Sequence, residues 1–137
     1  MGDLMQKPLT VTCAVMITGG ALFIAKRPWG SHLSGMWELP GGKAEAGESP
    51  RECLSRELRE ELNIHVKPGN LEYFDEVFYE YGNMRLRLVG FTVGAYSGKV
   101  QLNEHTDACW APIKSLETFQ FAPADIPIIR RIRKALP

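Results

Sequence analysis

The stretch from Gly42 to Ile64 reads GKAEAGESPRECLSRELREELNI, and it predicts a loop followed by a clearly marked helix. Ser49 can cap that helix, Pro50 suits its first turn, and Glu52 completes a capping box. The helix should end just before Asn63, because asparagine accepts the left-handed conformation that often closes a helix. This helix is the element from which the rest of the fold can be placed.

Carboxylates gather beside the packing stripe of this helix. At 100° per residue its leucines share one stripe, and the adjoining arc carries Glu57, Glu60 and Glu61. Such close carboxylates repel one another, and we expect Arg56 and Arg59 on a different side, where they cannot fully neutralise them. A divalent cation is the usual physical answer, and oxygen donors without clustered His or Cys favour Mg²⁺ or Mn²⁺. The alternative interpretation is a solvated charged face.

Residues 42–64 as a whole resemble the Nudix box. The pattern of that family is a glycine, a glutamate six residues later, and then Arg-Glu-aliphatic-x-Glu-Glu-x-Gly-aliphatic. The sequence departs from this pattern only at Asn63, where the family has glycine. WELPGGK at residues 37–43 resembles the segment before the box in MutT-type nucleoside triphosphate pyrophosphohydrolases. APADIP at residues 122–127 resembles the corresponding stretch of bacterial CTP pyrophosphohydrolases in that branch.

The resemblance implies an α+β fold, the Nudix α/β/α sandwich, in which a mixed β-sheet lies between helices. We expect residues 1–137 to form a single Nudix domain. The resemblance also implies a magnesium site, in which Mn²⁺ is a substitute, with ligands from the Gly41 carbonyl, Glu57, Glu60, Glu61 and Glu104. An ordinary loop acid is the alternative interpretation of Glu104.

The reaction that the resemblance implies is hydrolysis of a nucleoside triphosphate to the monophosphate and pyrophosphate. A triphosphate brings about four negative charges to a chain in which 16 Lys+Arg balance 16 Asp+Glu, so metal ions must neutralise it. A carboxylate then takes a proton from water, and the candidates are Glu57 first and Glu60 second. Arg27 and Lys43 flank the glycine-rich loop and are expected to bind phosphate, unless each is a solvated surface charge.

Asp125 is the candidate for recognition of the base, because the resembling enzymes carry a base-contacting Asn or Asp at this place. An ionised carboxylate accepts hydrogen bonds and donates none, so it favours a base edge rich in N–H donors. Cytosine and oxidised guanine have such edges, which predicts CTP, dCTP or 8-oxo-dGTP as substrate and sanitation of the nucleotide pool as role. The alternative is that Asp125 only caps the last helix.

Two other functions stay open. Tyr81 follows the box at a distance similar to that of a tyrosine in diadenosine polyphosphate hydrolases, which would make such a dinucleotide the substrate. A nucleotide-sensing Nudix domain without catalysis is the other alternative. The intact Glu57, Glu60 and Glu61 argue against it, because such domains commonly lose part of the box.

The composition excludes several further classes. The 137 residues are 45% hydrophobic and 23% charged, as in a soluble globular domain, and their balanced charge attracts neither a nucleic acid polymer nor a membrane. Three widely spaced cysteines predict reduced thiols and a cytoplasmic location. Residues 1–7 lack a signal region, and no run approaches the ~20 apolar residues of a membrane span. We expect a monomer or homodimer.

The remaining pattern predicts further strands and one more helix. Strands are expected at residues 9–17 and 21–25 around a glycine turn, at 71–81 and 84–93 as a hairpin, and at 99–102 and 108–111. Residues 28–47 should form a long functional loop. A helix is expected over residues 124–134. The three histidines, His32, His65 and His105, share no short spacing, so a structural or solvent-exposed role is expected for each.

Overall fold

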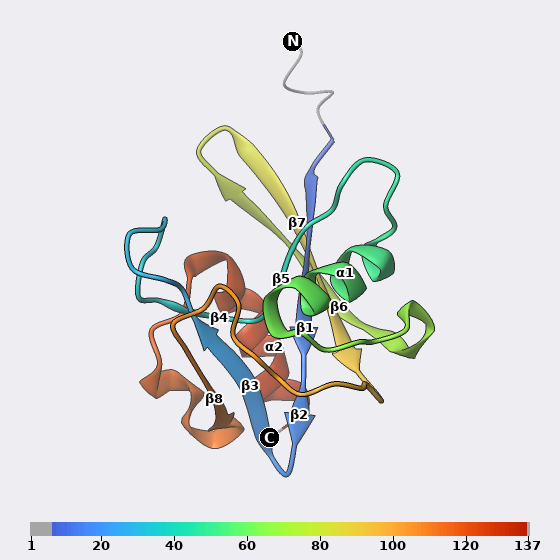
Figure 1. Ribbon diagram of the computed structural model, residues 1–137. Helices are drawn as coiled ribbons and strands as arrows, with labels where there is room; N and C mark the ends of the chain where they lie inside the picture. Colours follow the sequence, from blue (N-terminus) through green and yellow to red (C-terminus); the bar gives the residue numbers. More distant parts are fainter. Residues whose placement is uncertain (1–6, 137) are drawn as a thin grey trace.

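Figure 1 shows a computed structural model, which describes residues 7–136. Most of the N-terminal segment expected to lack a signal region therefore lies outside the described residues. A four-stranded sheet has the order β5 (Gly41–Lys43), β1 (Leu9–Val15), β7 (Met84–Val93) and β6 (Leu71–Tyr81). The sheet is mixed, because β1 runs parallel to β7 while the other neighbours are antiparallel.

A second sheet is built around β3 (Ala21–Lys26). Its neighbours are β2 (Ile17–Thr18), β4 (Trp37–Glu38) and β8 (Asp107–Pro112), all antiparallel to β3. Residue 16 separates β1 from β2, so the chain passes there from one sheet to the other. The single predicted strand over residues 9–17 is therefore wrong in extent, although the glycine turn before β3 is confirmed.

Two helices cover opposite faces of these sheets, as Figure 1 shows: α1 (Pro50–Leu62) and α2 (Ile126–Ala135). Alternate residues of a strand point to opposite faces. Accordingly, Ala14 and Phe23 pack in the core under α1, whereas Val15 and Ile24 pack in the core under α2. The predicted mixed sheet between helices is confirmed.

The helix α1 has the predicted ends. Ser49 accepts a hydrogen bond from the Glu52 N–H, and the Glu52 side chain accepts one from the Ser49 N–H, which completes the capping box. Asn63 closes the helix in the left-handed conformation, with φ 59° and ψ 29°. The stripe of leucines is fully buried, so the adjoining acidic arc has a fixed direction.

Two predictions about the loops are wrong. Residues 28–47 contain β4 and β5, which the Gly and Pro residues in and around these short strands concealed. Residues 99–102 form no strand, because the Gln101 N–H donates to the Leu62 carbonyl at the end of α1 instead of to a sheet neighbour. The β6–β7 hairpin has the predicted ends, β8 extends the prediction by one residue at each end, and α2 follows a short 3₁₀ turn, Pro123–Asp125.

Further 3₁₀ turns lie at Pro68–Asn70 and Ile113–Thr118. Within residues 7–136, no helix has the length and apolar character needed to cross a membrane.

Candidate active site

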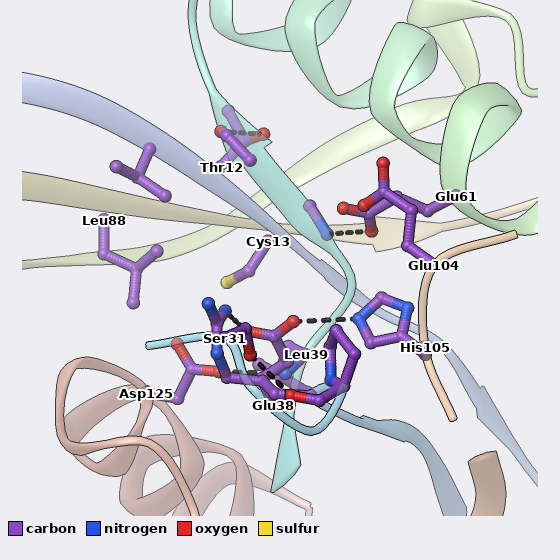
Figure 2. A pocket seen from close by; sticks show the side chains of 15 residues that line it. Thr12, Cys13, Ser31, Glu38, Leu39, Glu61, Leu88, Glu104, His105 and Asp125 are labelled. Atoms are coloured by element: carbon purple, nitrogen blue, oxygen red, sulfur yellow. Dashed lines mark hydrogen bonds and ion pairs between the residues drawn. The ribbon is translucent and has the colours of Figure 1, made fainter. Parts of the chain in front are cut away.

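A cavity of about 350 Å³ lies between the C-terminal end of α1, strand β5 and the start of α2. Glu61, Glu104 and Gly41 line one part of it, and Asp125 and Arg27 line another. Figure 2 shows the carboxyl groups of Glu61 and Glu104 at one side and Asp125 at the opposite side. The cavity therefore joins a cluster of carboxylates to a separate buried acid.

Two glycines allow β5 to lie close to its neighbours, Gly42 to the acidic arc of α1 and Gly41 to strand β1. A Cβ atom on Gly42 would lie 2.6 and 2.7 Å from the two carboxylate oxygens of Glu57. A Cβ atom on Gly41 would meet the Thr12 carbonyl oxygen and lie 2.8 Å from the Cα atom of Cys13, and its φ of 148° is one that other residues rarely adopt. Only glycine fits here without displacement of a neighbour.

Glu61 is the most buried carboxylate of the arc, with 6% of its surface exposed. Its Oε1 accepts a hydrogen bond of 3.2 Å from the Gly41 N–H. Burial, followed by the negative charge of Glu57, raises the pKa of Glu61 well above its usual range. Burial also raises the pKa of Glu57. These carboxyl groups are thus held where their negative charge is costly unless a cation accompanies it.

Arg56 contacts the acidic arc, contrary to the expectation that it lies on another side. Its Nη1 lies 3.0 Å from Oε1 of Glu57 and 3.1 Å from Oε1 of Glu60. The same guanidinium pairs with Glu48 at 2.7 Å and donates to the Lys43 carbonyl at 3.1 Å. Because this one cation is shared among four carboxylates, Glu45 at 3.7 Å included, and no contact joins it to Glu61, an excess of negative charge remains.

The donor set at this end of the cavity consists of oxygen atoms. In the described part of the chain, no three His, Cys, Asp or Glu side chains already stand in the arrangement of a metal centre. The carboxylates of Glu57 and Glu60 instead accept hydrogen bonds from Arg56. The chemistry of the set, carboxylates with a neighbouring backbone carbonyl, nevertheless suits a hard divalent cation.

Asp125 is buried and faces the cavity. Its Oδ2 accepts a hydrogen bond of 2.9 Å from the Leu39 N–H. Burial raises the pKa of Asp125 to about 7, although the bond from Leu39 lowers it. Asp125 stands at the N-cap position of α2, but its side chain makes no capping bond there. The interpretation of Asp125 as a helix cap is therefore wrong.

The two predicted phosphate-binding cations differ in their placement. Arg27 lines the cavity, where its Nη1 pairs with Glu38 Oε1 at 2.8 Å and its Nε donates to the His32 carbonyl at 2.7 Å. Lys43 is exposed on β5, and its side chain is not part of the cavity wall. The structure thus brings Arg27, but not Lys43, to the cavity with the carboxylates.

Two polar residues of the cavity wall, Glu38 and His105, were not among the functional residues predicted from the sequence. Glu38 bonds both Arg27 and His105, and the latter contact joins Glu38 Oε2 to His105 Nε2 at 2.8 Å. Glu38 lies in the WELPGGK segment, whose resemblance to the segment before the Nudix box could have identified this residue as functional. His105 follows Glu104 directly, but 67 residues separate it from Glu38, so no local pattern indicated the contact.

Comparison with protein families gives a match of the NUDIX domain to residues 6–132. The CTP pyrophosphohydrolase of Escherichia coli K12 is 36% identical over 90% of each chain. The 8-oxo-dGTP diphosphatase of the same organism is 30% identical, over 82% of this chain and 86% of the relative.

Solved structures agree with these sequence matches. The solution structure of the E. coli ORF135 protein superposes with a TM-score of 0.83 at 33% identity, and the match covers 100% of this chain and 97% of that one. A MutT structure from work on Aliivibrio salmonicida and Vibrio cholerae gives a TM-score of 0.78 at 28% identity, over 94% and 99% of the two chains. Fold and sequence therefore point to the same group of proteins.

Proposed function

Because the chain belongs to the Nudix family of hydrolases, we propose that it is a nucleoside triphosphate pyrophosphohydrolase that acts on CTP, dCTP or oxidised nucleotides such as 8-oxo-dGTP. The observation that carries this proposal is that one cavity has clustered carboxylates at one side and a buried base-reading candidate, Asp125, at the other. A nucleotide has the same two ends, since its phosphates require cations and its base offers hydrogen-bond donors. The names of the two E. coli relatives support this substrate class.

Members of this family generally need a divalent metal ion, and we propose Mg²⁺, with Mn²⁺ as substitute. The proposed ligands are the Gly41 carbonyl oxygen and the carboxylates of Glu57, Glu60, Glu61 and Glu104. When bound, such ions neutralise phosphate charge and ease the deprotonation of water. Their binding would also relieve the repulsion that raises the pKa of Glu61.

Glu57 is the proposed general base, with Glu60 as the second candidate. Burial raises the pKa of Glu57, so its carboxylate holds a proton more strongly than that of an exposed glutamate. Glu60 has half of its side chain exposed and is the more solvated of the two. The contact with Gly42 and the bond from Arg56 fix the direction of the Glu57 carboxylate.

At the other side of the cavity, Asp125 and Arg27 are the proposed contacts to the nucleotide. The Leu39 N–H occupies Oδ2 of Asp125, which leaves Oδ1 as the acceptor for an N–H donor of a base. The guanidinium of Arg27 is held by Glu38, and its remaining donors suit an α-phosphate oxygen. Lys43 remains a proposed phosphate contact from outside the cavity wall.

A panel of nucleotides incubated with Mg²⁺ and assayed separately for pyrophosphate and orthophosphate tests the proposal. We expect pyrophosphate and a monophosphate from CTP, dCTP or 8-oxo-dGTP. Cleavage of diadenosine polyphosphates in preference to these would identify the other hydrolase class. Tight nucleotide binding without any cleavage would identify a sensing domain.

The variant Asp125→Ala tests the base contact. Loss of a base-reading carboxylate should change the ratios of kcat/KM among CTP, dCTP, 8-oxo-dGTP and dGTP by an amount equivalent to ~1–3 kcal/mol. The ranking of these substrates should change accordingly. An unchanged ranking would remove the reason for preferring cytidine or oxidised substrates.

A further inference from the structure

Glu104 lies in a segment, residues 103–106, that belongs to no helix or strand. Its side chain lines the same cavity as Glu61. An irregular surface segment orders a carboxylate poorly unless other contacts hold it. The residues on either side of Glu104 supply such contacts.

Asn103 fastens the segment to the end of α1. Its Nδ2 donates to the Glu60 carbonyl at 2.7 Å, and its backbone N–H donates to the Glu61 carbonyl at 3.0 Å. The last carbonyls of a helix have no partner within the helix, so they are available to such donors. Both acceptors belong to residues of the acidic arc, which ties the position of Glu104 to that arc.

His105 fastens the other side of the segment to β4. The ring is buried, with 7% of the residue exposed, and its Nε2 lies 2.8 Å from Glu38 Oε2. Because a carboxylate accepts hydrogen bonds, Nε2 is the donor in this contact. Thr106 adds a backbone bond of 3.2 Å to the Lys26 carbonyl.

The other ring nitrogen of His105 shows that packing alone does not explain why a histidine occupies this position. Nδ1 is buried and has no hydrogen-bond partner among the described residues. A phenyl ring would fill the same volume without an unsatisfied polar atom. The bond from Nε2 to Glu38 is therefore the contribution that a histidine makes at this position.

We infer that Asn103 and His105 are positioning residues, which hold the carboxylate of Glu104 against those of Glu57, Glu60 and Glu61 for metal binding. Asn103 is anchored on the end of α1 and His105 is anchored on Glu38, and both act on the metal through Glu104. This inference rests on the proposed function, because it takes Glu104 as a metal ligand.

The inference can be tested without reference to turnover by measuring Mn²⁺ binding to the folded protein. The electron paramagnetic resonance signal of the free ion reports how much Mn²⁺ remains unbound. The variants are Glu104→Gln, His105→Phe, Asn103→Ala and the double variant Glu104→Gln/His105→Phe. Two matched controls lie outside the cavity wall, His65→Gln and Asn70→Ala. Melting temperatures accompany each measurement.

Residues that orient metal ligands typically change metal affinity by ~10–100-fold when they are replaced. We expect Glu104→Gln to weaken Mn²⁺ binding about 10-fold, and His105→Phe and Asn103→Ala to weaken it by a similar or smaller factor. The double variant should bind Mn²⁺ no more weakly than Glu104→Gln, because His105 acts through Glu104. His105→Gln, which keeps an N–H donor toward Glu38, should recover part of the affinity, and the controls should bind as the wild type does.

The outcomes separate the inference from the proposed function. If Glu104→Gln binds Mn²⁺ as the wild type does, Glu104 is not a ligand and the proposed metal site is wrong at this residue. If Glu104→Gln is weakened while His105→Phe and Asn103→Ala are not, the site stands and the positioning inference is overturned. A further loss in the double variant, equal to that of His105→Phe alone, also overturns it. If His105→Phe does not fold, the exposed Asn103→Ala carries the same test.

Discussion

Replacement of Gly42 by alanine should separate catalysis from stability. The added Cβ would lie 2.6 and 2.7 Å from the Glu57 carboxylate oxygens, whereas ordinary contacts begin near 3.4 Å. The flexible end of Glu57, rather than backbone, has to move, and the displacement is roughly 1 Å. A misplacement of that size can cost a catalytic group ~10²-fold in rate, or ~2.7 kcal/mol of transition-state stabilisation.

The stability of Gly42→Ala should change little. Gly42 does not have a left-handed φ, so alanine is compatible with its backbone and reduces the freedom of the unfolded chain, a gain of ~0.4–1 kcal/mol. Weakening the ion pair between Arg56 and Glu57 offsets this by up to about 1 kcal/mol. We therefore expect the free energy of unfolding to stay within about 1 kcal/mol of wild type while kcat falls about 100-fold.

Urea unfolding and kcat at saturating Mg²⁺ check this prediction, with two glycine variants as references. Gly69→Ala meets no atom within 4 Å and should change neither quantity. Gly41→Ala meets the backbone of Thr12 and Cys13 at a φ of 148°, so it should lose about 2–4 kcal/mol of stability. Wild-type kcat in a folded Gly42→Ala would refute the reasoning, because Glu57 would then not need its present position.

Three further predictions concern the charge and backbone of the site. Glu61→Gln should lower kcat at least ~10²-fold yet keep or raise the melting temperature, because glutamine replaces a buried carboxyl group whose negative charge is costly; normal turnover would exclude Glu61 as a ligand. Asn63→Gly should change the free energy of unfolding by about 1 kcal/mol or less, since Asn63 already has φ 59°; a large loss in urea unfolding would show that its side chain is needed. The pKa of Asp125, about 7 among the neighbouring Glu38, Arg27 and Cys13, is raised from 3.8, so the folded state binds this proton more tightly than the unfolded state does. The contribution of this proton to the free energy of unfolding is complete below about pH 4 and is lost as the pH rises through 7. Melting temperatures should therefore fall more from pH 4 to 8 for the wild type than for Asp125→Asn. Parallel curves would contradict the raised pKa of Asp125.

Local signals explain what the sequence could predict about the fold. The capping box at Ser49 and Glu52, the left-handed Asn63 and the turn of the β6–β7 hairpin all act over a few residues, and all were found in the structure. By contrast, β5 is a strand only because β1 pairs with it, as in the register of Thr12 with Gly42. No signal within residues 41–43 indicates that pairing, because glycine is unfavourable in an isolated strand.

The candidate site likewise contains some features that the sequence predicts and others that only the tertiary structure shows. Helical periodicity placed Glu57, Glu60 and Glu61 on one arc, and their position is a property of α1 alone. The reach of Arg56 across that arc depends on the conformation of one long side chain, which the helical angle does not determine. The bond between Glu38 and His105 joins residues from different elements, so it required the tertiary structure.

The segment from Leu39 to Gly41 connects the two chemistries of the cavity. The Leu39 N–H donates to Asp125, and the Gly41 N–H, two residues later, donates to Glu61. The proposed base contact and the proposed metal site are thus fixed by neighbouring peptide groups of one short segment, which is itself held by the bond from the Ala14 N–H to the Pro40 carbonyl. Because backbone bonds set both positions, side-chain changes at the mouth of the cavity can alter the base that is preferred without moving the carboxylates. That arrangement is a physical reason why this chain can resemble relatives named for different nucleotides, CTP and 8-oxo-dGTP.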